Sequence, residues 1–222
     1  MKKLLVLVFC IATFGLISTA RSQAGADNDS WKNITLGPMF MPGASVEAGT
    51  VATGAKTNMQ FAWCLGAVSC FPFSPSFGLQ LALCYDDRAV GFYDQNNSNN
   101  YVNYTFSYFS LRPEFMMGDF LIGLGLGVPI GASTSQQNET APSLGASSMN
   151  FLIEGRIGAS IPVVVADNGN SLRFIINGSY AFSQITNGPL EPAFGSTDKT
   201  KNNGPLGTLQ LGFAYLFNLN PH

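Results

Sequence analysis

Apolar and polar side chains alternate with a period of two residues in eight segments of this chain. The clearest segment covers residues 209–219, where every odd position is apolar and the even positions are mostly small or polar. Because successive side chains of a β-strand point to opposite faces, this pattern predicts strands with one apolar and one polar face. The predicted strands cover approximately residues 32–42, 59–71, 77–86, 101–116, 120–130, 149–161, 171–183 and 209–219.

The connections between these strands alternate between short and long. Short turns are predicted at residues 72–76, 118–119 and 166–170, and long polar loops at residues 43–58, 94–100, 133–148 and 187–205. This alternation is typical of an up-and-down transmembrane β-barrel, which has short periplasmic turns and long extracellular loops. The pattern indicates one barrel domain.

Charge is scarce in this sequence. Charged residues make up 11% of the chain, whereas soluble globular domains contain about 25%. Much of the surface is therefore expected to face something other than water. After the N-terminal segment no apolar run reaches the roughly 18 residues of a spanning helix, and a closed β-barrel is the other structure that pairs its backbone groups within hydrocarbon. We predict an all-β fold, an eight-stranded antiparallel up-and-down transmembrane β-barrel.

The N-terminal segment has the parts of an export signal. Residues 1–24 contain a basic start, an apolar stretch at residues 4–17 and small-residue cleavage sites at Ala20 or Ala24. Its removal takes away three of the 11 basic residues, which leaves 8 against 13 acidic residues and a formal charge of −5 for residues 25–222. No basic patch for nucleic acid remains. We therefore expect an exported protein of the bacterial outer membrane.

The fourth predicted strand changes the parity of its apolar positions. They fall at Tyr104, Phe106 and Tyr108 and then at Phe109 and Leu111, which indicates a β-bulge near Tyr108. Aromatic residues also gather into two bands, as in interfacial girdles, although β-propensity alone favours aromatics at strand ends. The band near the short turns contains Phe71, Phe73, Phe77, Phe115, Phe120 and Phe217, and the band near the long loops contains Phe92, Tyr93, Tyr101, Tyr104, Tyr180 and Phe182.

The last strand also carries a pattern that resembles the C-terminal insertion signal of bacterial outer-membrane barrels. The residues that match its polar position, glycine and two aromatics are Gln210, Gly212, Tyr215 and Phe217. Together with residues 76–85 and 108–115, they make the chain similar to the small outer-membrane β-barrel superfamily, of the OmpA-like and PorT-like kind. The resemblance implies contact with outer-membrane lipid, and with the barrel-assembly machinery through the last strand.

Several charged residues are expected to point into the barrel. The strand that lies between two charged strands offers only Gly123, Gly125 and Gly127 inward, so longer side chains have room to meet across it. We predict a buried arginine and glutamate network that fills the lumen as a structural plug, with a gated proton or ion path as the alternative. The network residues are Arg112, Glu114, Glu154, Arg156 and Arg173.

Catalysis is disfavoured by the available residues. The only histidine is His222, at the end of the chain, so a histidine-dependent hydrolytic site is not expected. Asp86 and Asp87 are adjacent, and adjacent residues of a strand point to opposite faces, so we interpret them as a solvated loop edge. No cluster has the spacing of a metal site, and no cofactor is expected.

Three cysteines follow the export signal. A turn centred near residues 72–76 pairs positions whose numbers sum to about 148, which places Cys64 opposite Cys84 on the inward face. The oxidising periplasm permits a disulfide between them, and two buried free thiols are the alternative. Cys70 is expected to be a small, unpaired core residue.

These observations are consistent with three functions. The first is a non-enzymatic outer-membrane barrel with a structural or surface-interaction role and a protein partner at the surface or in the periplasm. The second is a narrow channel, or an accessory subunit of an outer-membrane secretion or assembly machine. The third is a soluble lipocalin-like barrel, in which Phe, Leu and Ile side chains would line a cavity for an apolar ligand.

Overall fold

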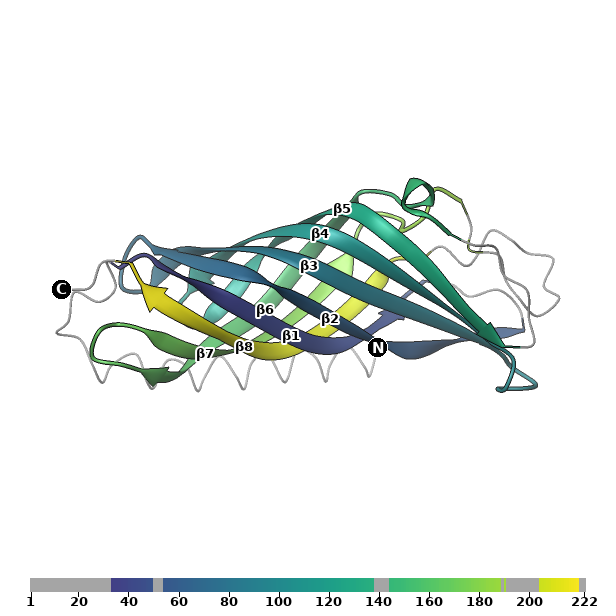
Figure 1. The fold of residues 1–222 in the computed structure, drawn as a ribbon, viewed down its shortest axis with the longest axis horizontal. Coiled ribbons are helices and arrows are strands. Elements are labelled where there is room, and N and C mark those ends of the chain that lie inside the picture. Colours follow the sequence, from purple (N-terminus) through teal and green to yellow (C-terminus); the bar gives the residue numbers. More distant parts are fainter. Residues whose placement is uncertain (1–32, 50–53, 138–143, 189, 191–203, 220–222) are drawn as a thin grey trace.

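A computed structural model of the protein describes residues 33–49, 54–137, 144–188, 190 and 204–219. These residues form, in chain order, β1 (Thr35–Glu47), β2 (Ala55–Pro72), β3 (Phe77–Asp94), β4 (Tyr101–Met117), β5 (Phe120–Gln137), the 3-10 helix η2 (Ala146–Ser148), β6 (Leu152–Val165), β7 (Ser171–Ala181) and β8 (Leu206–Asn218). Each strand pairs antiparallel with the next, and β1 pairs with β8, so the sheet closes into an up-and-down barrel (Figure 1).

The predicted fold class, an eight-stranded antiparallel up-and-down barrel, is confirmed. Among the described residues no helix is long and apolar enough to cross a membrane. The export signal at residues 1–24 lies outside the described residues, so its removal stays a prediction.

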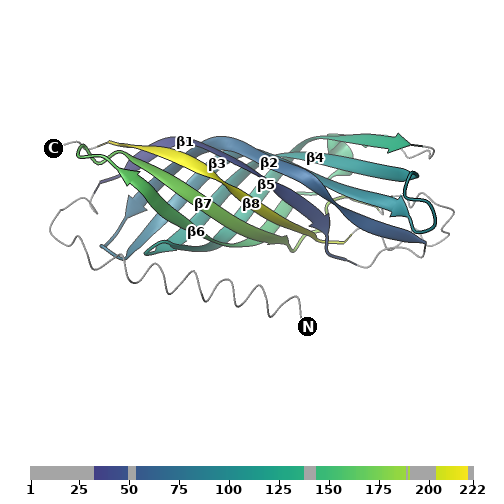
Figure 2. The same cartoon turned by 90° about the horizontal axis from the view of Figure 1, so that it is seen from below.

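Four strands are longer at the loop end than the closed barrel requires. Pairing of β2 with β1 ends at Gln60 and pairing of β5 with β6 ends at Gly127. In contrast, β2 to β5 stay paired with one another as far as Asp94, Tyr101 and Gln137. They continue past the barrel, at the right of Figures 1 and 2. We call this part the extension; it consists of residues 55–59, 87–94, 101–107 and 131–137.

The polarity of the wall inverts along β4. In the closed barrel the inward residues of β4 include the charged Arg112 and Glu114, whereas the outward Phe109 is 48% exposed. In the extension the inward residues Tyr104 and Phe106 are apolar and buried. The outward residues there are polar: Asn103, Thr105 and Ser107. Along β4 the closed part of the barrel thus has apolar outward residues and polar inward residues, and the extension has the opposite arrangement.

This inversion explains the change of parity that predicted a β-bulge near Tyr108. Buried and exposed residues alternate without interruption along β4, so this strand itself contains no additional residue. A register shift does occur beside Tyr108, but the additional residue is Ile130 of β5, because Ser107 pairs with Gly131 and Tyr108 pairs with Pro129. The apolar interior of the extension had the sequence pattern of a membrane-facing surface.

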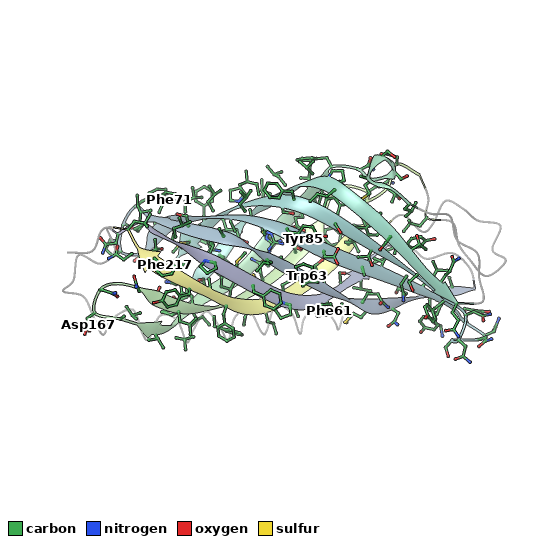
Figure 3. The ribbon with its side chains drawn as sticks, viewed as in Figure 1. Phe61, Trp63, Phe71, Tyr85, Asp167 and Phe217 are labelled. Atoms are coloured by element: carbon green, nitrogen blue, oxygen red, sulfur yellow. The ribbon has the colours of Figure 1, made fainter. Side chains whose placement is uncertain are left out.

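The aromatic band predicted near the long loops is only partly on the surface. Phe92 and Tyr104 point inward and are 3% and 1% exposed. On β3 the outward apolar residues end at Tyr85, whose ring contacts that of Trp63 with the centroids 5.3 Å apart (Figure 3). Near the short turns, Phe217 lies on the outer surface, as expected for the other band (Figure 3).

Candidate functional site in the barrel lumen

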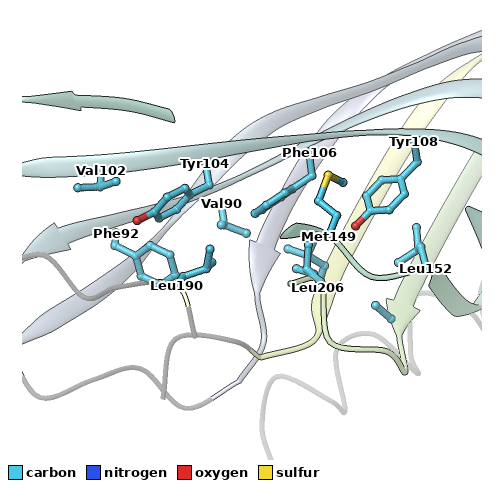
Figure 4. Packing of buried hydrophobic residues seen from close by; sticks show 12 residues of the cluster. Val90, Phe92, Val102, Tyr104, Phe106, Tyr108, Met149, Leu152, Leu190 and Leu206 are labelled. Atoms are coloured by element: carbon cyan, nitrogen blue, oxygen red, sulfur yellow. The ribbon is translucent and has the colours of Figure 1, made fainter. Parts of the chain in front are cut away.

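Buried side chains fill the barrel interior in three layers. The lower apolar cluster, nearest the short turns, includes Met39, Met41, Val68, Leu121, Ile175 and Leu216. The upper apolar cluster lies at the loop end and reaches into the extension (Figure 4); it includes Phe92, Val102, Tyr104, Phe106, Met149 and Leu206. Between the two clusters is a charged layer of arginine, carboxylate and amide side chains.

Arg88 of β3 joins two carboxylates at the centre of the charged layer. Its Nε and Nη2 donate to Oδ2 of Asp86 at 3.0 and 2.5 Å. Its Nη1 and Nη2 donate to Oε2 and Oε1 of Glu154 at 2.6 and 3.0 Å. Asp86 also lies 2.8 Å from Nη2 of Arg112 and accepts a hydrogen bond from Nε2 of Gln210 at 3.3 Å. Asp86, Arg88 and Glu154 are all 0% exposed.

Glu114 of β4 is the centre of the other half of the layer. Its Oε1 accepts from Nε of Arg156 at 3.1 Å and from Nδ2 of Asn177 at 2.5 Å. Its Oε2 accepts from Nε2 of Gln80 at 3.0 Å. Arg156 Nη1 donates to Oε1 of Glu154 at 2.5 Å, which connects the two halves. Three arginines therefore balance three carboxylates within one network of hydrogen bonds and ion pairs.

The glycines of β5 make room for this network. A Cβ atom at Gly125 would come within 2.6 Å of Cγ of Glu154, and one at Gly123 would come within 2.6 Å of Cα of Glu114. Any larger residue at these positions would displace the glutamates or the backbone. The contact between Arg156 of β6 and Glu114 of β4 crosses over β5 in this space.

The structure brings together four of the five residues predicted for the network: Arg112, Glu114, Glu154 and Arg156. Arg173 is separate. It lies nearer the short turns, where its Nε donates to Oγ of Ser160 at 2.8 Å and its Nη2 is 3.6 Å from Oδ1 of Asp119.

Sequence reasoning missed Arg88, and the interpretation of Asp86 as part of a solvated loop edge is wrong. The third strand was expected to end at Asp86, where the run of apolar residues stops. The inward positions of β3 in fact continue through Asp86 and Arg88. The useful signal was the parity of these two residues, which matches the inward-facing Gln80.

The cysteine register also differs from the prediction. Paired residue numbers in β2 and β3 sum to 150 rather than 148, so Cys64 pairs with Asp86 and Cys84 is its diagonal neighbour. Cys64, Cys70 and Cys84 are buried free thiols. Nη1 of Arg112 donates to Sγ of Cys64 at 3.2 Å, which connects this thiol to the charged layer.

The residues of the predicted insertion signal lie on both faces of β8. Gln210 is buried in the lumen, and Gly212 shares its inward face. Tyr215 and Phe217 point outward near the short turns, with ring centroids 4.9 Å apart. Their role in membrane insertion stays a prediction.

The charged layer connects strands on different sides of the barrel wall. Its contacts join side chains of β3, β4, β6, β7 and β8. Among the described residues no group of three or more His, Cys, Asp and Glu side chains could hold a metal ion, and His222 lies outside that part of the chain. Because each charged residue of this layer has a partner of opposite sign, removal of one partner would be costly.

The sequence matches no protein-family model, and a comparison with curated proteins finds no match. Solved structures of similar fold include the outer membrane protein OprG from Pseudomonas aeruginosa, 15% identical over 84% of this chain and 96% of that chain, with a TM-score of 0.38. The attachment invasion locus protein Ail of Yersinia pestis is 15% identical over 83% and 98%, also with a TM-score of 0.38. The outer membrane protein AlkL is 14% identical over 90% and 96%, with a TM-score of 0.37. A likeness at this level concerns the arrangement of strands alone.

Proposed function

We propose that the protein is a non-enzymatic barrel of the bacterial outer membrane, with a plugged lumen and a structural or surface-interaction role. The observation that carries this proposal is the inversion of polarity along β4. Around the charged layer the outward Phe109 and Leu111 are exposed apolar residues, as contact with hydrocarbon requires. In the extension the inward residues of β4 are apolar and the outward Asn103, Thr105 and Ser107 are polar, as in a sheet surrounded by water.

The height of the outward apolar surface supports a membrane-spanning role. On β5 the outward residues are apolar from Phe120 to Ile130. This stretch of roughly ten residues is about 33 Å long at about 3.3 Å per residue. With the usual strand tilt of about 40°, its height is about 25 Å, which equals the apolar band of outer-membrane barrels.

The proposal includes a route to the membrane. Residues 1–24 direct export and are removed, and the last strand, through Gln210, Gly212, Tyr215 and Phe217, is recognised by the barrel-assembly machinery. The short turns then face the periplasm, and the extension projects from the cell surface, where it is available to a protein partner. Outer-membrane lipid contacts the wall between these two ends.

Cell fractionation combined with gel mobility tests the proposal. We expect the protein in the outer-membrane fraction, with an unboiled form that migrates differently from the boiled form because the closed barrel survives detergent. Recovery in the soluble fraction without a heat-dependent shift would overturn the proposal and favour the lipocalin-like alternative. That alternative leaves the exposed apolar band, including Phe109 at 48% and Phe115 at 62%, in contact with water.

A narrow channel is the second candidate, and the charged layer is the observation that favours it. Conduction would require the ion pairs around Arg88 and Glu154 to separate, and both apolar clusters to admit water. Conductance across planar bilayers distinguishes the two functions, because a plugged barrel passes no measurable current. Crosslinking in cells from the extension or from the short turns tests whether the protein is an accessory subunit of a secretion or assembly machine.

A further inference from the structure

A pocket of about 410 Å³ lies on the extension, at the tip of the β3–β4 hairpin. Its lining residues are Asn58, Phe92, Tyr93, Ser98, Tyr101 and Asn103. They come from three neighbouring strands and the hairpin loop. Asn58 and Asn103 both pair with Gly91, and Tyr93 pairs with Tyr101, so two adjacent rows of the sheet contribute to the pocket. These rows face away from the upper apolar cluster, to which the remaining lining residue Phe92 belongs.

A glycine, Gly91, lies between the two asparagines that line the pocket. A Cβ atom at Gly91 would come within 2.5 Å of Nε2 of Gln60 and 2.6 Å of Oδ1 of Asn103. Glycine therefore allows these two amide side chains to approach over the backbone of β3. Asn58 and Asn103 therefore flank this glycine, and the two tyrosines lie on the adjacent row.

The chemistry of the lining selects among classes of ligand. None of its six residues is charged, so the pocket lacks the groups that bind a phosphate or a metal ion. The amides of Asn58 and Asn103 and the hydroxyls of Ser98, Tyr93 and Tyr101 both donate and accept hydrogen bonds. The tyrosine rings add flat apolar surface. A ligand that fits must have many hydroxyl groups and one apolar face, which is the chemistry of a sugar ring.

We propose that this pocket binds a neutral saccharide. The lining alone carries this assignment, whereas the source of the sugar depends on the proposed membrane-spanning function. Tyr93 is eight residues beyond Tyr85, which marks the end of the outward apolar surface. At about 3.3 Å per residue and a tilt of about 40°, the pocket lies about 20 Å above the hydrocarbon. The sugars of outer-leaflet glycolipids occupy this zone, and so do free oligosaccharides.

Binding can be measured with the full-length mature protein in phosphatidylcholine nanodiscs. The probes are two neutral oligosaccharides, maltotriose and chitotriose, each followed by NMR of the protein. A second set of nanodiscs contains the intact rough lipopolysaccharide. Saturable binding of a free probe supports recognition of free saccharide, and shifts at the pocket in the lipopolysaccharide nanodiscs alone support recognition of a membrane glycolipid.

Variants connect the binding to the pocket. We expect Tyr101→Ala and Asn103→Ala each to weaken it at least about tenfold. The matched control is Thr105→Ala, two residues along the same outward face and outside the lining, which should bind as the parent does. The heat-dependent gel shift verifies that each variant is folded, and it also reports separately on the barrel itself. Absence of saturable binding in both sets of nanodiscs, or equal binding by parent and both pocket variants, would overturn the saccharide proposal.

Discussion

Removal of Arg88 should destabilise the barrel more than removal of any arginine outside the charged layer. Arg88→Met deletes four charge-assisted hydrogen bonds, two to Asp86 and two to Glu154, and leaves carboxylates that are 0% exposed short of a partner. Loss of one partner from a buried ion pair costs about 3–5 kcal/mol. We expect this loss in the free energy of unfolding, measured by urea titration in lipid vesicles with tryptophan fluorescence.

Two further variants test the reasoning. Arg173→Met removes a longer, partly exposed ion pair and the hydrogen bonds to Ser160, and should cost about 1–2 kcal/mol. In the double variant Arg88→Met with Glu154→Leu, Asp86 keeps Arg112 and Glu114 keeps Arg156. This double variant should therefore recover part of the lost stability. The account is refuted if Arg88→Met costs no more than Arg173→Met, or if the double variant is less stable than Arg88→Met.

Three other outcomes are expected. Mass mapping of the mature protein without reducing agent should find Cys64 and Cys84 as free thiols. Diagonal strand neighbours are about 7–8 Å apart at Cα, which is longer than the Cα–Cα distance of most disulfide-bonded cysteines. A peptide that contains both cysteines joined by a disulfide would contradict this expectation. Ser45→Ala should lower the free energy of unfolding by about 2 kcal/mol. Oγ of Ser45 donates to the carbonyl of Ala89 and accepts from its N–H, at the place where the β2 register is irregular. Unchanged unfolding in urea would show that water replaces the serine hydroxyl. Phe217→Ala should lower the fraction of heat-modifiable protein in outer membranes. An unchanged fraction would show that Phe217 is not needed for membrane insertion.

The strand order was predictable because the outward positions of the closed barrel are mostly apolar. On β3, for example, Phe77, Leu79, Leu81, Leu83 and Tyr85 all point outward. The extension was not predictable in the same way. Alternation with a period of two residues shows that the two faces of a strand differ. It does not show which face is inside. When the surroundings change from hydrocarbon to water, the apolar face changes from outside to inside, and at Tyr108 and Phe109 this change has the same sequence pattern as a bulge.

The inward direction of the charged side chains was predictable, because odd and even residues of a strand point to opposite faces. Glu154 and Arg156 are inward-facing residues in a strand with an apolar outer face, and the glycines of β5 indicated the space around them. Parity says nothing of height along the barrel, which is why Arg173 was grouped with a layer that it does not contact. The buried position of Asp86 was not predicted for another reason. The apolar pattern of the third strand stops before Asp86, although the backbone pairing of β3 continues beyond it.

The polar outer surface of the extension also sets the depth at which the barrel can sit in a bilayer. Asp87 accepts a hydrogen bond from Oγ of Ser107 at 2.7 Å on that surface, directly above the ring of Tyr85. A downward shift by one pair of residues would bring this carboxylate into hydrocarbon, and an upward shift would bring Tyr85 and Phe109 into water. Both displacements cost free energy, so the barrel has one preferred vertical position. A wall with apolar residues along its whole length would lack this restraint and could drift along the membrane normal.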